Sequence, residues 1–169
     1  GAIRNAMHIL ELNIERSQQS RETLAELQKK LKLQRLPERM ECFDISNFQG
    51  KDPVSSMVVF IDGEPAKSEY RRFHIRKKNT PDDFAMMLET LRRRFAHLDD
   101  PNWEKPDLIV VDGGKGQLNI ARRVLEELNI ENVELIGLAK SRALQTDTSE
   151  DLKRSPERVF VPNVKDPIV

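Results

Sequence analysis

The sequence predicts an α/β fold in which a mixed five-stranded sheet is flanked by helices. Three strand-like segments follow one another closely in the first half of the chain, and helical and strand-like segments alternate after them. Consecutive strands with short connections pair antiparallel, whereas a helix between two strands makes a parallel crossover. The chain has 169 residues, of which 38% are hydrophobic, so it can bury the core that such a sheet needs.

Residues 3–32 are predicted to form one helix, and Pro37 ends its pattern. The apolar residues recur at steps of three and four, as on one face of a helix: Met7, Leu10, Ile14, Leu24, Leu27 and Leu31. This segment can fill little of a core alone. We therefore interpret residues 1–37 as an N-terminal helical segment or linker, and residues 38–169 as the folded domain.

Three strands are predicted next, over residues 40–46, 54–61 and 67–75. Asp62-Gly63, between the second and the third, is a typical hairpin turn signal. The short connections predict an antiparallel meander.

A helix with a clear start follows the meander. Thr80 is expected to cap it, Pro81 suits its first position, and Asp82 and Asp83 suit the positive end of the helix dipole. The residues expected to be buried recur at helical spacing: Phe84, Met87, Leu88, Leu91 and Phe95.

The rest of the predicted sheet alternates with a second helix. Residues 107–111 form a short apolar strand, typical of a central strand covered on both faces, and residues 133–138 form a fifth strand after a helix over 118–128. Residues 141–158 are polar, and a short apolar piece follows at 159–161. Three antiparallel strands followed by crossovers are the order of the ribonuclease H-like fold.

Two acids lie where a catalytic site is expected. Asp44 interrupts an apolar strand, where a carboxylate is costly to desolvate unless it is paired or binds a metal. Asp112 follows an apolar run and precedes two glycines, and ligands bind outside the carboxyl ends of strands in open sheets. Taken singly, Asp44 also suits a solvent-facing strand end, and Asp112 suits a turn that supports the glycines.

Asp83 is the acid for which a purely structural role is the strongest alternative to a catalytic one. It lies three residues after Thr80, where an acid completes a capping arrangement. It also lies four residues before Met87 and eight before Leu91, on the inward-facing side of the helix. Asp82 projects closer to the polar side and is the better pure capping residue.

Together the three acids predict a metal-dependent site for phosphodiester hydrolysis. The first and fourth strands are adjacent in a ribonuclease H-like sheet, so Asp44 and Asp112 are expected to converge, with Asp83 brought toward them. Clustered carboxylates repel one another unless a cation lies among them, and hard oxygen ligands suit Mg²⁺ or Mn²⁺. Zinc is less expected, because no His or Cys falls at ligand spacing to these acids. Cys42, the single cysteine, can form no internal disulfide.

Basic residues near these acids are candidates for contacts with a nucleic-acid backbone. The chain is neutral overall, with 28 Lys and Arg against 28 Asp and Glu, but residues 67–78 hold six basic residues and one acid. A second basic cluster lies at 92–94, and a lysine stands in the glycine-rich loop at a helix start, where N–H groups can meet a phosphate. Solvated surface charge is an equally good interpretation of any one arginine. The predicted DNA-binding residues are Arg71, Arg72, Arg92, Arg93 and Lys115.

Two sequence blocks are highly specific: Glu41-Cys-Phe-Asp-Ile-Ser46 and Asp112-Gly-Gly-Lys-Gly-Gln-Leu118. Further blocks are Ser56-Met-Val-Val-Phe60, Glu69-Tyr-Arg-Arg-Phe73, Asp82-Asp-Phe84, Leu91-Arg-Arg-Arg94 and Ile136-Gly-Leu-Ala-Lys140. In this order they closely resemble the C-terminal nuclease half of the UvrC family, the excinuclease subunit of bacterial nucleotide excision repair. The resemblance covers roughly residues 38–169.

The resemblance implies a ribonuclease H-like domain that makes the incision 5′ to a lesion in double-stranded DNA. It implies Mg²⁺ or Mn²⁺ and no small-molecule cofactor, and its catalytic and metal-binding acids carry over to Asp44, Asp83 and Asp112. The implied partners are damaged DNA and UvrB, with UvrA acting upstream, in the bacterial cytoplasm and away from membranes.

One departure from the family affects the expected activity. The family's catalytic histidine lies in a later helix, and no residue of this sequence matches it. We therefore expect the domain over 38–169 to be truncated at its C-terminus, and the fragment to bind metal but to be inactive or weak as a nuclease. The alternative function is a non-catalytic module that binds DNA or a repair partner. The specific blocks argue against a different ribonuclease H-like enzyme.

Overall fold

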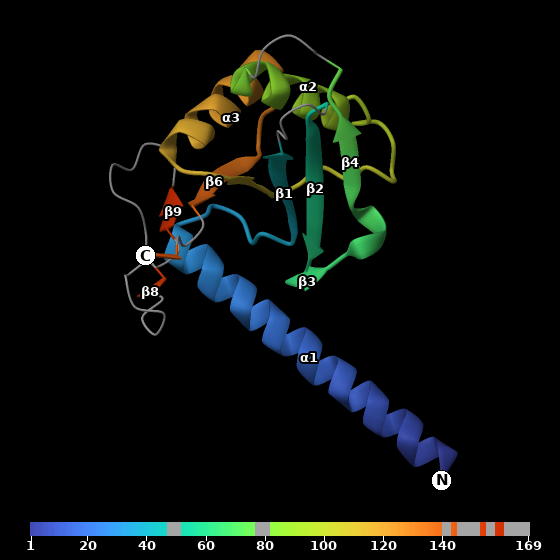
Figure 1. Cartoon of the computed structure of the whole chain (residues 1–169). Coiled ribbons are helices and arrows are strands. Elements are labelled where there is room, and N and C mark those ends of the chain that lie inside the picture. The colour runs from blue at the N-terminus through green and yellow to red at the C-terminus, as the bar shows by residue number, and fades with distance from the viewer. Residues whose placement is uncertain (47–51, 77–81, 140–142, 145–152, 155–157, 161–169) are drawn as a thin grey trace.

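A mixed sheet forms the centre of the structure, which is a computed structural model that describes residues 1–46, 52–76, 82–139, 143–144, 153–154 and 158–160 (Figure 1). The strands of this sheet are β1 (Arg39–Ser46), β2 (Val54–Ile61), β3 (Glu64–Pro65), β4 (Arg71–His74), β5 (Leu108–Asp112), β6 (Glu134–Ala139) and β9 (Arg158–Phe160). A separate antiparallel pair consists of β7 (Ala143–Leu144) and β8 (Lys153–Arg154). The α-helices are α1 (Ala2–Leu31), α2 (Asp83–Phe95) and α3 (Lys115–Glu127).

The strand order is β3-β2-β1-β5-β6-β9, and β4 also pairs with β2. Strand β2 is antiparallel to β1 and to β4, whereas β5 is parallel to both β1 and β6. The predicted α/β class, the antiparallel start and the adjacency of the first and fourth predicted strands are confirmed. The sheet has more strands than the five predicted, because β3 and β9 extend it at its two edges.

The segment predicted as one strand over residues 67–75 is only partly a strand. The Asp62-Gly63 turn is present, with φ of 52° and 82°, and it returns the chain to pair with the end of β2 as β3. A 3₁₀ turn, η1 (Lys67–Glu69), then interrupts the pairing before β4 resumes it. The residues of η1 are not buried, whereas Phe73 of β4 is 5% exposed, so only the second part of the segment packs on the core.

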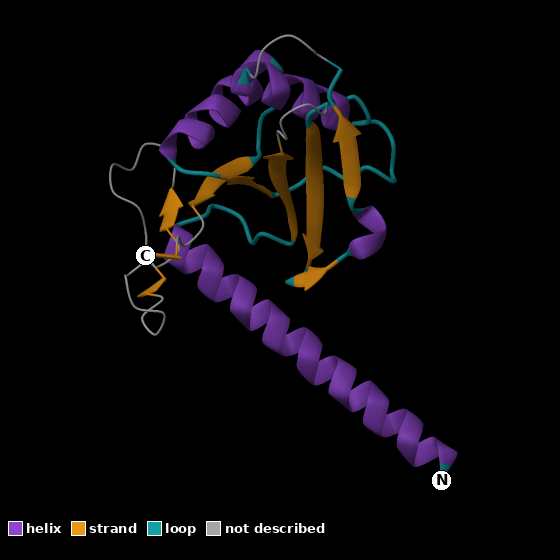
Figure 2. Ribbon diagram, viewed as in Figure 1, coloured by secondary structure: helices purple, strands orange, loops and turns teal. Residues whose placement is uncertain are grey.

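Strand β5 is the buried centre of the sheet, as predicted for residues 107–111. Its first four residues are at most 9% exposed. Because side chains alternate along a strand, Ile109 and Val111 join the cluster packed under α2 and α3, whereas Leu108 and Val110 join a cluster on the other face. Figure 2 shows α2 and α3 together on one side of the sheet and α1 on the other.

Helix α1 confirms the helix predicted over residues 3–32, but only its C-terminal part packs against the domain. Leu24 and Leu31 are 1% and 3% exposed, while Met7 and Leu10 are 57% and 60% exposed. The N-terminal part extends away from the sheet (Figure 1). None of the helices in the described part of the chain is long and apolar enough to cross a membrane.

Candidate active site

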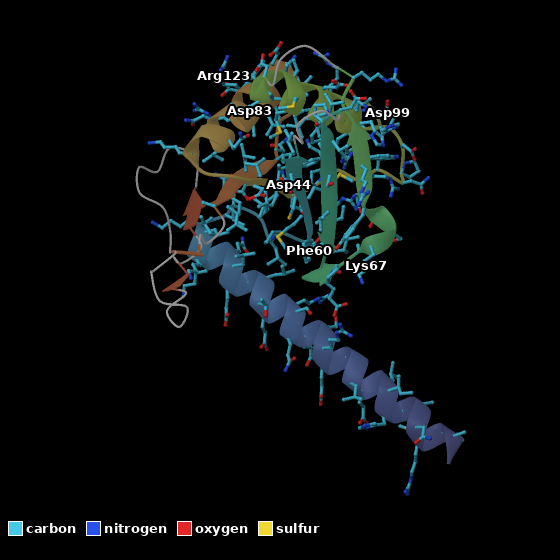
Figure 3. All side chains as sticks on the ribbon, in the orientation of Figure 1. Asp44, Phe60, Lys67, Asp83, Asp99 and Arg123 are labelled. Atoms are coloured by element: carbon cyan, nitrogen blue, oxygen red, sulfur yellow. The ribbon has the colours of Figure 1, made fainter. Side chains whose placement is uncertain are left out.

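The carboxyl ends of β1 and β5 bring two of the three predicted catalytic acids together. Phe43 is the register partner of Val111 in the neighbouring parallel strand, so the residues that follow them, Asp44 and Asp112, are neighbours at the same sheet edge. Adjacent strands lie about 4.8 Å apart, and side chains in register project from the same face. Both acids are half-buried. Figure 3 labels Asp44.

Asp83 is the first residue of α2, and it is exposed rather than turned inward as expected. Asp82 caps the helix, because its Oδ1 accepts hydrogen bonds at 3.0 and 3.3 Å from two backbone N–H groups of the first turn. The prediction that Asp82 is the better capping residue is confirmed. The predicted cap at Thr80 is wrong, since the helix begins later; Thr80 and Pro81 themselves lie outside the described residues.

Gln117, in the first turns of α3, connects Asp83 to the loop that follows Asp112. Its Nε2 donates to Oδ2 of Asp83 at 3.2 Å. Its stem packs against Gly113, where an added Cβ would lie 2.5 Å from Cγ of Gln117. Gly113 also has a φ of +146°, which side chains disfavour. The glycine next to Asp112 therefore makes room for the side chain that binds Asp83.

The donor set suits a hard divalent cation bound by two carboxylates. Among the described residues, no group of three His, Cys, Asp or Glu side chains is placed to hold a metal ion. Mg²⁺ often uses only one or two carboxylates, and water and substrate phosphates supply its other ligands. Asp44 and Asp112 meet that requirement.

A buried ion-pair network fixes α2 to β1, the helix and the strand that carry two of the acids. Glu41 is 0% exposed, and Arg94 of α2 donates to it through Nε and Nη2 at 2.6 and 2.7 Å. Arg39 donates to Glu41 at 2.9 Å and to Glu69 at 2.6 Å. Burial by itself lowers the pKa of Arg39, but the hydrogen bonds and charges of Glu69 and Glu41 outweigh burial and raise that pKa.

Two of the five predicted DNA-binding residues are engaged with the protein itself. Arg71 is half-buried, donates to two backbone carbonyls just before it in the chain, and lies over the ring of Trp103. Arg93 donates to a backbone carbonyl of β4 at 2.7 Å and lies over the ring of Phe73. Their guanidinium groups therefore stabilise the β4 region whether or not they also contact DNA.

The other three, Arg72, Arg92 and Lys115, are exposed. Lys115 begins α3 directly after the Asp112 loop, where the helix N-terminus favours an anion. Arg92 lines a hollow of about 370 Å³ along α2 that carries three arginines, which suits phosphate contacts. The residues around this hollow are Arg76, Ala85, Leu88, Glu89, Arg92 and Arg93.

Sequence reasoning missed three residues around this site. Gln117 lies inside a recognisable block, but no spacing rule separates a glutamine that binds an acid from a solvated one. Arg123 of α3 is exposed and lies over the ring of Phe84, 4.7 Å from its centroid (Figure 3). Arg94 belongs to the predicted basic cluster at 92–94, yet it is 0% exposed, which is rare for an arginine.

The family model and the sequence relatives that match this chain point to the same protein family. A family model described as the UvrC RNAse H endonuclease domain matches residues 28–169. The UvrABC system protein C of Geobacter sp. (strain M21) is 50% identical over 165 residues, which are 98% of this chain and 25% of that protein. The same protein of Geobacter metallireducens is 48% identical over 167 residues, 98% of this chain and 27% of that protein. The chain thus spans about a quarter of the length of these relatives.

Similarity to solved structures is lower. Endonuclease V of Ciona intestinalis, in complex with an inosine-containing DNA, aligns over 95% of this chain and 81% of its own, with 17% identity and a TM-score of 0.45. The family is therefore assigned from the family model, which covers most of the sequence. That model describes a ribonuclease H domain, in agreement with the strand order. The chain therefore belongs to the UvrC RNase H endonuclease domain family.

Proposed function

We propose that this chain is the catalytic domain of a DNA endonuclease that makes the incision 5′ to a lesion in bacterial nucleotide excision repair. The observation that carries the proposal is the placement of Asp44 and Asp112 on adjacent parallel strand ends in a chain of the UvrC family. Two half-buried carboxylates beside a glycine-rich loop suit a cation that also binds a phosphate.

Asp44, Asp83 and Asp112 are the proposed ligands of Mg²⁺ or Mn²⁺, and a bound cation would activate water for attack and offset charge on the phosphate. Asp44 and Asp112 supply the principal oxygens, because their strands are held in the sheet. Asp83, which does not form a three-acid group with them in the described structure, is proposed to reach the cation from the first turn of α2 with the oxygen that does not accept from Gln117. Lys115 contacts a neighbouring phosphate at the start of α3.

Exposed arginines extend the proposed DNA surface along α2 and β4. Arg92 and Arg76 line one hollow, and Arg72 is exposed on the neighbouring strand, so all three suit backbone phosphates. Phosphate contacts position DNA without reading its sequence, which suits an enzyme that acts wherever a lesion lies. Because the chain carries no net charge, we propose that UvrB, after UvrA, brings the DNA to it in the bacterial cytoplasm.

The test is a 5′-incision assay on damaged duplex DNA with UvrB and Mg²⁺ or Mn²⁺. It uses a form of the protein in which this chain is joined to a segment that carries the family's histidine. Asp44→Ala and Asp112→Asn should each lower incision at least about 100-fold, since each removes a ligand of the cation. Asp99→Asn, which neutralises an exposed acid outside the site, is the matched control and should incise normally. Unchanged incision by Asp112→Asn would sink the assignment.

The 169-residue chain alone is proposed to bind the cation and to be inactive or weak as a nuclease, since no residue of its sequence matches the family's histidine. One observation favours the non-catalytic alternative: the described residues contain no three-acid cluster. That alternative predicts DNA or UvrB binding in the same assay without incision.

A further inference from the structure

We propose that Gln117 is a positioning residue of the metal site, which orients the Asp83 carboxylate and joins it to the Asp112 loop. The inference rests on the proposed function, because Asp83 needs a fixed orientation only if it takes part in binding the cation.

Gln117 lies between two parts of the site. It is half-buried, and its Nε2 donates to Oδ2 of Asp83 at 3.2 Å. Its Cβ and Cγ lie against Gly113, at 2.8 and 2.5 Å from where a Cβ on that glycine would be. Because Gly113 directly follows Asp112, one side chain spans the distance from the Asp112 loop to the start of α2.

An amide suits this role better than a charged group does. The N–H of Gln117 stabilises the Asp83 carboxylate without adding a positive charge that would repel a cation. Its bond to Oδ2 restricts rotation of the carboxylate, so Oδ1 is the proposed ligand oxygen. Carboxylates that bind metals are commonly held by such hydrogen bonds, and loss of the outer partner weakens metal binding or activity by about 10–100-fold.

The backbone of Asp83 is held independently of Gln117. The far end of α2 is fixed by the buried pair of Arg94 and Glu41, and Asp82 caps its first turn. Replacing Gln117 should therefore change how the Asp83 carboxylate is oriented while the helix stays in place. This makes metal affinity a sharper measurement than stability.

The experiment is a calorimetric titration of the whole 169-residue chain with Mn²⁺. Gln117→Leu removes the donor at similar side-chain volume, and Asn119→Leu makes a similar change at an exposed position of the same helix. We expect the Mn²⁺ Kd to rise about tenfold or more for Gln117→Leu and to stay unchanged for Asn119→Leu. The thermal unfolding midpoints of both variants should stay close to that of the unmodified chain.

A double-mutant cycle separates positioning from a general structural effect. In an Asp83→Asn background, Gln117→Leu should no longer change the Mn²⁺ Kd. An undiminished effect in that background, or an unchanged Kd for Gln117→Leu alone, overturns the inference while the proposed function stands. If the unmodified chain shows no Mn²⁺ binding that Asp112→Asn removes, the proposed function itself fails, and this inference fails with it.

Discussion

Replacing Arg94 by methionine tests what fixes α2 to the sheet. Methionine keeps much of the length and apolar character of the side chain but removes the guanidinium group. Among the side-chain hydrogen bonds of the described residues, Glu41, which is 0% exposed, would keep the one from Arg39 at 2.9 Å. The backbone carbonyl of Glu104 would also lose its bond from Nη2 of Arg94 at 2.6 Å.

The expected loss of stability follows from the charge that stays buried. Removing one partner of a buried ion pair costs about 3–5 kcal/mol, because the other partner remains desolvated. The lost bond to Glu104 adds about 1 kcal/mol. Nη1 of Arg94 is buried without a hydrogen-bond partner in the described part of the chain, so removing that atom offsets a similar amount. A net loss of about 3–5 kcal/mol is a large share of the roughly 5–15 kcal/mol that stabilises a domain.

The assay is urea unfolding, followed by circular dichroism and by the fluorescence of Trp103, the single tryptophan. The Arg94 guanidinium lies 5.4 Å from the Trp103 ring centroid, so the substitution can change the fluorescence directly. The two probes must therefore give the same unfolding midpoint. Arg92→Met, on an exposed residue of the same helix, is the matched control and should stay within about 0.5 kcal/mol. Glu41→Leu combined with Arg94→Met should recover much of the loss, because apolar groups replace the pair. A loss below about 1 kcal/mol for Arg94→Met would refute this reasoning.

Three further predictions concern single residues. Burial, and to a smaller extent the charge of Glu41, raises the pKa of Cys42 from 9.0 to about 11, so iodoacetamide should alkylate the folded chain near neutral pH far more slowly than the urea-unfolded chain. Between pH 9 and about 11, the folded state keeps the thiol proton and the unfolded state loses it. The contribution of Cys42 to stability is therefore complete below pH 9 and falls as the pH rises toward about 11. Urea unfolding midpoints measured across this pH range can follow the loss. Gly113→Ala should cost about 1–3 kcal/mol in urea unfolding, because the φ at this position is +146°. It should also weaken Mn²⁺ binding in calorimetry, because the Cβ of the alanine would displace Gln117. An unchanged Mn²⁺ Kd would contradict the second expectation. Asp82→Ala should cost about 1 kcal/mol in thermal unfolding through loss of the helix cap, and Asp82→Asn should restore most of it; equal midpoints for both variants would show that the cap does not matter.

Local patterns in the sequence determined much of the fold and two of the acids. The apolar run at 108–111 predicted a central strand, and Asp62-Gly63 predicted a hairpin turn. The order of strands and helices then placed Asp44 and Asp112 at one edge of the sheet. These features are readable because strand alternation, turn conformation and short connections depend on neighbouring residues along the chain.

The tertiary structure alone decided which distant side chains meet. It buried Arg94 against Glu41, 53 residues earlier in the chain, and it hydrogen-bonded Gln117 to Asp83 across 34 residues. It also replaced part of the third predicted strand by a 3₁₀ turn. In the sequence, a buried arginine looks like a surface arginine and a positioning glutamine looks like a solvated one. The partner that makes the difference arrives only when α2 and α3 pack together on the sheet.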